Sequence, residues 1–405
     1  MNTYTINVKN FGAMGDGTTD DTMALQKAID TAAAQGGGTV YVPASTSAYP
    51  ISSTLFVEAN ITLYLDNGAV IYLQDGSNCP MLSNKYRTSP DQLAITDHHI
   101  SVIGGVWDGN GSRNERIAAD GNLNAGFAFF GVRHLLIRDV TVNATVLYGI
   151  FICNWEDVKI SNVDINQTNL NNQDGIHFQG PGNHAIVEDI YAYTFDDAVA
   201  FNCDDVPSGP YATVGDQSHI QIRNITFRKS LNGIRLLCAK HSLRKVTVSG
   251  LRGEVTDNVV ALSNYQLGTG GQFQDILIED VKVDASGAHC NFMNEYGGYI
   301  TINDHVRNVT VRNVHRRDED GRATVRVQSR ADIQDLLIED VITYGDGLHS
   351  EYGAIRLEAG SKVRNATVRH CKLYNNPELA GSRQLIDTAG SRVGMLLMDS
   401  CMIHQ

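Results

Sequence analysis

The sequence predicts an all-β fold: a single-stranded right-handed parallel β-helix, or solenoid, with an N-terminal capping α-helix. Three observations support this prediction: a short internal repeat, strand-like alternation inside each repeat, and a composition of 38 glycines against 8 prolines in 405 residues. Central strands exclude proline, whereas tight turns use glycine. This composition therefore favours strands joined by many turns.

A four-residue pattern recurs along most of the chain: an apolar residue, any residue, then Asn, Asp or a small residue, then a second apolar residue. Successive copies begin 23 to 35 residues apart. Such a period indicates stacked structural repeats. The copies begin at Ile137, Ile160, Val187, Ile222, Val248, Ile278, Val311, Ile338, Val368 and Met398.

Each repeat alternates apolar and polar residues, as strands do. Residues 275–283, for example, read Asp-Ile-Leu-Ile-Glu-Asp-Val-Lys-Val. The repeat is too short for a strand–helix–strand crossover, so a run, a turn and another run describe one coil of a parallel β-helix. Equivalent residues of neighbouring coils then stack about 4.8 Å apart and form columns.

A helix over residues 20–35 is predicted to cover the N-terminal end, because an open solenoid end exposes strand edges. Thr18 or Thr19 suits the N-cap, and apolar residues between Ala24 and Ala32 recur at helical spacing. Three glycines, residues 36–38, are expected to end the helix.

The composition fits one soluble globular domain, with 42% apolar and 19% charged residues. We assign residues 1–60 to the N-terminal entry and cap and residues 61–405 to the coils of a single domain. The net charge of −13 argues against a nucleic-acid partner, since phosphate binding needs basic surfaces. No run approaches the roughly 18 apolar residues of a membrane span, so we expect no membrane partner.

The 7 cysteines include no Cys-x-x-Cys motif and are predicted to be reduced, buried thiols. With no export signal at the start, a cytoplasmic location is expected, or a secreted one if a leader has been removed. We expect no metal and no cofactor, and a homo-oligomer is left open.

Two segments carry a family resemblance. Residues 10–21, with the Gly-Gly-Gly-Thr-Val-Tyr-Val-Pro run at 36–43, resemble the start of the pectate-lyase-like right-handed β-helix superfamily. Residues 105–111, Gly-Val-Trp-Asp-Gly-Asn-Gly, resemble a turn common in family 28 glycoside hydrolases, the polygalacturonase-like enzymes. The resemblance implies the β-helix fold and cleavage of glycosidic bonds.

The active-site motifs of that family are only partly present. Residues 172–174 match its Asn-x-Asp motif, residues 196–197 its Asp-Asp motif, and residues 233–235 its arginine motif. The sequence departs from the family in lacking Gly-His-Gly and in having Leu237 in place of a lysine. Both groups help the family engage uronate carboxylates, so these departures argue against ordinary polygalacturonate as the substrate.

Aligning the coils gives four five-residue segments whose third and fifth positions are always apolar and are predicted to face the core. Their first positions place Asp174 and Asp197 in adjacent coils, with Asp196 beside them, which predicts a carboxylate cluster. The segments begin at Tyr148, Asp174, Asp197 and Asn232, and their third positions, expected to form one interior stack, are Ile150, Ile176, Val199 and Ile234.

Glycosidic cleavage requires one carboxylic acid to protonate the leaving oxygen and one carboxylate to activate water or attack directly. By the resemblance, Asp196 is the acid, and Asp174 and Asp197 hold the water in an inverting mechanism. Coil spacing alone permits either the inverting or the closer retaining arrangement. The competing interpretation is that these residues only satisfy turns, as Asn and Asp ladders do elsewhere in the repeat.

Further side chains are predicted to bind substrate, each with an alternative role. His177 is expected to contact substrate or to tune a carboxylate, and Arg235 to bind a hydroxyl or carboxylate group or to pair with an acid. Aromatic faces bind sugar rings, although core packing is an equal alternative for Trp155. The predicted substrate-binding residues are His177, Asn202, Arg235, Asn232, Tyr148 and Trp155.

The sequence therefore favours a glycoside hydrolase acting on an oligo- or polysaccharide. One alternative is a uronic-sugar lyase or epimerase on the same fold, which needs a base at the acidic carbon and a cation for the carboxylate; Arg326 and Arg356 extend the outward column of Arg235. The other is a noncatalytic glycan-binding or tail-type β-helix.

Overall fold

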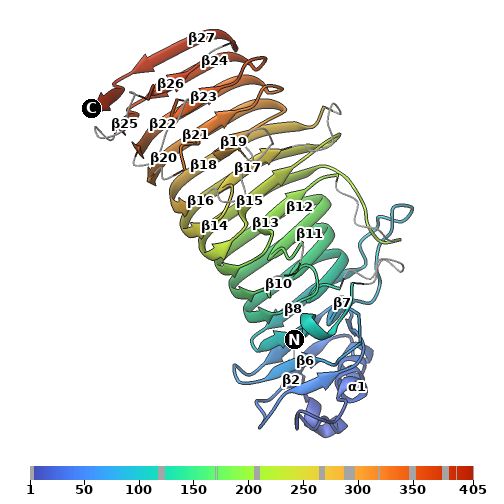
Figure 1. Cartoon of the computed structure of the whole chain (residues 1–405). Coiled ribbons are helices and arrows are strands. Elements are labelled where there is room, and N and C mark those ends of the chain that lie inside the picture. Colours follow the sequence, from blue (N-terminus) through green and yellow to red (C-terminus); the bar gives the residue numbers. More distant parts are fainter. Residues whose placement is uncertain are drawn as a thin grey trace. The chain divides into compact units, whose positions relative to one another are not determined.

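The protein folds as a right-handed parallel β-helix, which confirms the predicted fold class (Figure 1). The structure is a computed structural model. It describes residues 4–116, 124–168, 170, 172–204, 210–263, 270–286, 297–317, 320–345, 353–375, 383–388 and 390–404.

The chain forms two compact units, Met1–Asp196 with Asp205–Gly215, and Asp197–Asp204 with Asp216–Gln405. The assignment of the whole chain to one domain stays a prediction. The described residues contain no helix that is long and apolar enough to cross a membrane.

The first unit contains the helix α1 (Thr22–Ala34), two 3-10 helices and the first twelve strands. Its 3-10 helices are η1 (Val8–Phe11) and η2 (Gly111–Arg113). Its strands are β1 (Thr5–Asn7), β2 (Gly38–Val42), β3 (Tyr49–Ile51), β4 (Leu55–Val57), β5 (Ile61–Leu65), β6 (Val70–Leu73), β7 (Leu82–Asn84), β8 (Asp97–Ile103), β9 (Val106–Asp108), β10 (Phe127–Asn143), β11 (Ile150–Asn166) and β12 (Ile176–Tyr193).

The described part of the second unit consists of strands and their turns. The strands are β13 (Asp197–Asn202), β14 (Gln217–Ser230), β15 (Asn232–Leu237), β16 (Ser242–Val255), β17 (Val260–Ser263), β18 (Gln272–Ala285), β19 (Gly298–Ile302), β20 (His305–Arg317), β21 (Ala323–Val327), β22 (Asp332–Gly345), β23 (Ile355–Leu357), β24 (Lys362–Arg369), β25 (Lys372–Asn375), β26 (Ile386–Asp387), β27 (Arg392–Asp399) and β28 (Met402–His404).

Strands of successive coils pair in parallel and in the predicted register. In the first unit Ile150 pairs with Ile176 across β11 and β12, and in the second unit Val199 pairs with Ile234 across β13 and β15. All four side chains are at most 1% exposed. The predicted core stack is therefore confirmed within each unit. Figure 1 shows the ribbons of β10, β11 and β12 running side by side.

The third position of the repeat is where each coil turns, because this residue adopts the left-handed backbone conformation. Asp139, Asn162 and Asp280 have φ of 60°, 52° and 57°. Asn and Asp tolerate this conformation better than other residues with a Cβ atom. They also connect coils: Nδ2 of Asn162 donates a hydrogen bond to Oδ1 of Asp139 at 2.8 Å. The preference for Asn and Asp at this position thus has a backbone cause.

Replacing Asn162 with valine should lower the free energy of unfolding by about 1–2 kcal/mol, because a β-branched residue is strained at a positive φ. Asn162→Gly is the matched control. It loses the same hydrogen bond to Asp139 but accepts the left-handed conformation without strain. Chemical denaturation of both variants measures the difference, and equal midpoints for valine and glycine would contradict the backbone explanation.

The capping helix is close to its predicted bounds, but its N-terminus differs. The prediction that Thr18 or Thr19 caps the helix is wrong. Both threonines instead donate hydrogen bonds of 2.7–3.0 Å to the carboxylate of Asp16. Asp21 occupies the N-cap position without a side-chain cap and accepts hydrogen bonds from preceding backbone N–H groups. Asp16, which lies upstream of the helix, therefore binds both threonines and keeps them from capping it. Helix-cap rules do not consider such a competing acid.

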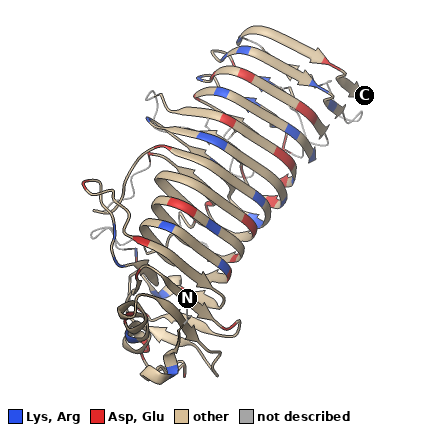
Figure 2. Ribbon diagram, turned by 180° about the vertical axis from the view of Figure 1, so that it is seen from behind, with Lys and Arg blue, Asp and Glu red and all other residues tan. Residues whose placement is uncertain are grey.

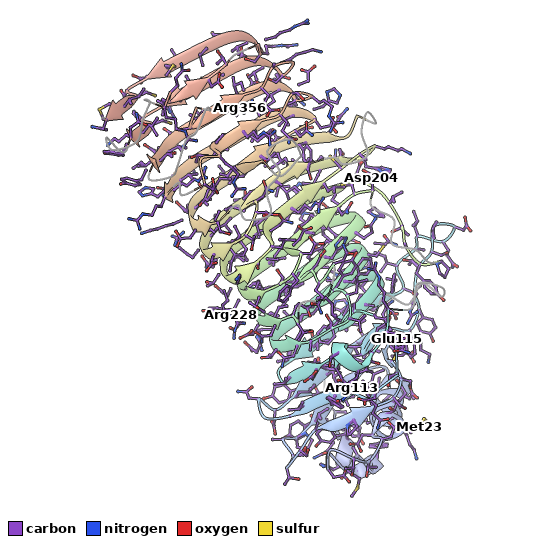
Figure 3. The ribbon with its side chains drawn as sticks, in the orientation of Figure 1. Met23, Arg113, Glu115, Asp204, Arg228 and Arg356 are labelled. Carbon is purple, nitrogen blue, oxygen red and sulfur yellow. The ribbon has the colours of Figure 1, made fainter. Side chains whose placement is uncertain are left out.

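Helix α1 is attached to the first coil by an amide. The side chain of Gln26 donates to the carbonyl of Phe56 in β4 at 2.9 Å and accepts from its N–H at 2.8 Å. The apolar stripe is buried, whereas Met23 on the opposite face is 78% exposed (Figure 3). The backbone N–H groups of Gly36 and Gly37 cap the C-terminal carbonyls, as the glycine run predicts.

A buried charged cluster lies in the second unit, at the turn between β20 and β21. Arg316 and Arg322 are 1% and 0% exposed, and both contact Asp320. Arg322 donates from Nε at 2.9 Å and from Nη2 at 2.7 Å, and Arg316 donates from Nη2 at 2.6 Å. Burial by itself raises the pKa of Asp320, but the two guanidinium groups outweigh it and lower the pKa to about 2.

The six cysteines that the structure describes are free thiols. Four of them, Cys153, Cys203, Cys238 and Cys371, are buried. Burial raises the pKa of Cys153 to about 11 and that of Cys371 to about 12. These thiols are protonated at neutral pH and serve packing rather than nucleophilic chemistry.

Candidate active site

Two of the predicted catalytic carboxylates lie together in the first unit. Asp174 lies two residues before the first residue of β12, and Asp196 lies three residues after its last. A carboxylate oxygen of Asp174 lies within 4.8 Å of one of Asp196. Asp174 is 3% exposed and Asp196 is half-buried. The pair supplies the two carboxyl groups that glycosidic cleavage requires.

The Asn-Gln-Asp segment fixes both carboxylates. Nδ2 of Asn172 donates to Oδ2 of Asp196 at 3.1 Å. Gln173 is fully buried; its Oε1 accepts from the N–H of Leu170 at 2.7 Å, and its backbone carbonyl accepts from the N–H of Phe195 at 3.2 Å. The sequence reasoning missed Gln173, which occupies the variable position of the Asn-x-Asp motif and so carried no signal of its own.

His177 contacts Asp174 directly. Its Nδ1 lies 2.7 Å from Oδ2 of Asp174, and both side chains are 5% exposed. The imidazole ring stacks on Tyr148 at 4.5 Å between centroids and on Phe151 at 5.5 Å. His177 thus contacts one of the predicted carboxylates, and its role toward substrate stays a prediction. Tyr148 lies in the same stack and is half-buried.

The second unit holds Asp197, Arg235 and Asn232. Oδ2 of Asp197 accepts a hydrogen bond from Nη1 of Arg235 at 3.4 Å, with side chains 5% and 13% exposed. Asn232 stands opposite Asp197 in the β13–β15 register, as predicted. Arg235 therefore pairs with an acid, which was the alternative to substrate binding. The roles of these three residues toward substrate stay predictions.

The prediction that Trp155 lies on the substrate-binding surface is wrong. Trp155 is 2% exposed and packs edge-to-face on Phe178 at 5.0 Å. Asn154 has a φ of 55°, and the register of β11 against β12 shifts between Cys153 and Trp155. This irregularity reverses the strand alternation, so the indole faces the core rather than solvent.

Asn202 is also placed differently from its prediction. It is 3% exposed, and its Oδ1 accepts from the N–H of Asp204 at 3.2 Å, so it supports a turn. Asp204 in turn accepts from the N–H groups of Ala239 and Lys240 and contacts the ring of His241. Burial acts to raise the pKa of Asp204, but these hydrogen bonds outweigh it and lower the pKa. Asp204 is labelled in Figure 3.

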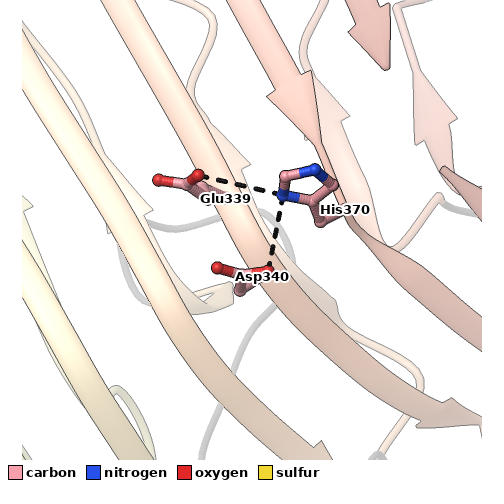
Figure 4. A group of neighbouring side chains, drawn as sticks. All are labelled: Glu339, Asp340 and His370. Carbon is pink, nitrogen blue, oxygen red and sulfur yellow. Dashed lines mark ion pairs between the residues drawn. The ribbon is translucent and has the colours of Figure 1, made fainter. Parts of the chain in front are cut away.

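A separate group of Glu339, Asp340 and His370 lies on the surface of the second unit (Figure 4). Nδ1 of His370 lies 3.9 Å from Glu339 and 3.7 Å from Asp340. The hydrogen bond from Arg369 lowers the pKa of Glu339. Asp340 and His370 are left-handed turn residues of adjacent coils. Turn structure and the arginine pair account for this group, and we assign it no ligand.

Family comparison agrees with the observed fold. The profile of the rhamnogalacturonase A/epimerase, pectate lyase-like family matches residues 5–252, more than half of the chain. Fold and family together define a carbohydrate-active β-helix protein. The chain belongs to the rhamnogalacturonase A/epimerase, pectate lyase-like family.

Two solved structures share the fold at low identity, and a further relative matches a short segment of the sequence. The family 28 exopolygalacturonase of Yersinia enterocolitica has a TM-score of 0.61 and 17% identity over 98% of this chain and 76% of its own. The A-module of mannuronan C-5 epimerase AlgE4 of Azotobacter vinelandii has a TM-score of 0.54 and 17% identity over 99% and 97%. Mannuronan C5-epimerase AlgE3 of Azotobacter vinelandii is 52% identical over 60 residues, which are 14% of this chain and 3% of the epimerase.

Proposed function

We propose that this protein is a glycoside hydrolase that cleaves glycosidic bonds of an oligo- or polysaccharide. The observation that carries the proposal is the approach of carboxylate oxygens of Asp174 and Asp196 to within 4.8 Å, in a segment held by hydrogen bonds of the buried Gln173. Membership of a carbohydrate-active family supports it. By the resemblance, Asp197, the next residue in the chain, completes the acidic set.

In the proposed reaction Asp196 donates its proton to the glycosidic oxygen as the bond from that oxygen to the anomeric carbon breaks. The carboxylate of Asp174 takes a proton from the attacking water, or attacks the anomeric carbon itself. Nδ1 of His177 lies 2.7 Å from Oδ2 of Asp174 and orients this carboxylate in the proposed reaction. Asn172 orients the acid through its amide.

The spacing of the carboxylates bears on the stereochemical course. Inverting enzymes separate their carboxyl groups by about 6.5–9.5 Å, and retaining enzymes by about 5–5.5 Å. Only the nearest carboxylate oxygens of Asp174 and Asp196 are within 4.8 Å, and the carboxyl groups themselves lie farther apart, so this approach fits either course. The family resemblance implies inversion, with the water held by Asp174 and Asp197. The anomeric configuration of the first product distinguishes retention from inversion.

A uronic-sugar lyase or epimerase is the second candidate, favoured by the stacked His177 and Tyr148 beside Asp174. Such an enzyme removes a proton next to the sugar carboxylate and needs a cation to neutralise that carboxylate. Arg326 and Arg356 do share a column in the second unit, but Arg326 donates to Glu358 at 2.7 Å. Because this arginine is paired with an acid, we favour the hydrolase.

Incubation with a panel of defined glycans, followed by proton NMR, tests the proposal. We expect new reducing ends and one anomer in the first product. Absorbance of an unsaturated sugar would instead identify a lyase, and a changed ratio of uronate epimers without chain cleavage would identify an epimerase. Binding of a glycan with none of these products would support the noncatalytic alternative and overturn the hydrolase.

A further inference from the structure

A polar groove of about 370 Å³ lies on the second unit, across the first residues of β18, β20, β22 and β24. Its lining comes entirely from that unit, whereas Asp174 and Asp196 belong to the first unit. None of the predicted catalytic or substrate-binding residues lines it. The lining residues are Gln272, Phe273, Gln274, His305, Val306, Arg307, Asp332, Ile333, Gln334 and Arg364.

The floor and walls of the groove follow from strand alternation. Phe273, Val306 and Ile333 are at most 2% exposed and belong to the core beneath. The residues on either side of each of them point outward and stack in two columns, because the three floor residues pair with one another from coil to coil. One wall contains Gln272, His305 and Asp332; the other, called here the Gln–Arg column, contains Gln274, Arg307, Gln334 and Arg364.

The Gln–Arg column has an alternating chemistry. An amide and a guanidinium group follow each other from coil to coil along the axis of the unit. Coils are about 4.8 Å apart, so the two guanidinium groups recur at about 10 Å with an amide between them. A guanidinium binds a carboxylate through two parallel hydrogen bonds, and an amide both donates to and accepts from hydroxyl groups.

The arginines of this column differ from other exposed arginines of the unit. Arg312 and Arg369 donate to Glu279 and Glu339 at 2.6 and 2.7 Å. Arg307 and Arg364 are exposed, and their side chains form no hydrogen bond or ion pair with the residues that the structure describes. Figure 2 shows acidic and basic segments interspersed on the coils, so unpaired guanidinium groups are not explained by a shortage of acids.

The opposite wall does not repel an anion strongly. The carboxylate of Asp332 lies 3.6 Å from Nζ of Lys362 on the next coil, which offsets its charge. Nε2 of His305 lies 3.9 Å from Oδ1 of Asp304, and its imidazole ring adds a polar group to this wall. The groove thus offers charged fork donors on one side and mixed donors and acceptors on the other, over a closed apolar floor.

We propose that this groove is a second glycan-binding site, for an extended acidic saccharide in which a carboxylate-bearing sugar alternates with a neutral one. One sugar of an extended chain advances by about the rise of one coil, so carboxylates on alternate sugars meet Arg307 and Arg364, while neutral sugars face the glutamines. The site holds the chain and performs no chemistry. This proposal depends on the proposed function in one respect only, namely that the ligand is a glycan.

Isothermal titration with a tetrasaccharide of alternating glucuronic acid and N-acetylglucosamine tests the proposal. In the Arg307→Gln/Arg364→Gln variant we expect affinity to fall by about tenfold or more. The control variant Arg330→Gln/Arg392→Gln removes the same charge from exposed positions outside the lining. Its affinity should stay within about twofold of the wild type, because the loss comes from the two bidentate guanidinium–carboxylate pairs and not from net charge.

Further ligands separate the proposal from its alternatives. Oligogalacturonate, with a carboxylate on each sugar, should bind more weakly than the alternating chain, and equal binding would overturn the alternation. Inorganic phosphate that binds with the same arginine dependence while the saccharide does not would show a simple anion site. Unchanged affinity in the Arg307→Gln/Arg364→Gln variant also overturns the proposal. Titration in an Asp174→Asn background is independent of turnover, so failure of the hydrolase leaves this result interpretable.

Discussion

Replacing Asp174 or Asp196 with asparagine is expected to lower turnover of the glycan substrate by about a thousandfold or more, equivalent to about 4 kcal/mol of transition-state stabilisation. The amide keeps the shape and the hydrogen bonds of the turn but cannot donate or accept the catalytic proton. Asp197→Asn should behave likewise. Initial rates on the glycan identified by NMR, together with thermal midpoints, measure the effect.

The control for these variants is Asp280→Asn. Asp280 is a turn residue with a φ of 57°, and asparagine adopts the same backbone conformation and still accepts a hydrogen bond from Asn313. Its turnover should match that of the wild type. If the three site variants fold normally and keep more than about a tenth of wild-type turnover, the carboxylates are turn residues and the catalytic assignment is wrong.

Asp320→Asn is expected to lower the free energy of unfolding of the second unit by about 3–5 kcal/mol, because it leaves Arg316 and Arg322 as buried charges without their acid. The two arginines are 1% and 0% exposed, so water cannot replace the lost carboxylate. Asp332→Asn is the control, since its carboxylate is 48% exposed and should contribute less than about 0.5 kcal/mol. Urea denaturation at pH 7 measures both variants.

The same carboxylate predicts a pH dependence of stability. The folded-state pKa of Asp320 is about 2, below the ordinary value of 3.8 for an aspartate. Its contribution is therefore complete above pH 3.8 and is lost as the pH falls through about 2. The wild type should lose stability over this window by more than Asp320→Asn does. Parallel acid titrations of the two proteins by circular dichroism would contradict the linkage if their curves had the same shape.

The fold could be predicted from the sequence because the same two physical causes act in each coil. Period-2 alternation places apolar residues inside, and the left-handed turn selects Asn or Asp, so both signals recur at matching intervals. The same regularity predicted that Asp174 and Asn232 begin equivalent strands. Where a strand was irregular the prediction failed: the left-handed Asn154 reverses the alternation, and Trp155 faces the core.

The sequence could not predict which polar side chains are buried by contacts with distant residues. The His-Arg-Arg-Asp-Glu-Asp-Gly-Arg run at residues 315–322 has the composition of a solvated surface turn, yet Arg316 and Arg322 are buried. Both guanidinium groups contact Asp320, and Arg322 also donates to the backbone carbonyls of Gly298 and Asp257 on other coils. Gln173 was missed for a related reason, because its partners are backbone groups that no residue pattern identifies.

The one-residue turn of the repeat also has an evolutionary consequence. Each coil carries its own turn residue, and a strand such as β18 pairs only with the equivalent strands before and after it, β16 and β20. An in-frame duplication or deletion of one repeat therefore creates no unpaired strand inside the stack. The length of a surface ladder such as the Gln–Arg column can change by whole coils while the Asp174 segment keeps its neighbours. Under the two proposals made above, selection can thus adjust the length of the saccharide-binding groove independently of the catalytic site.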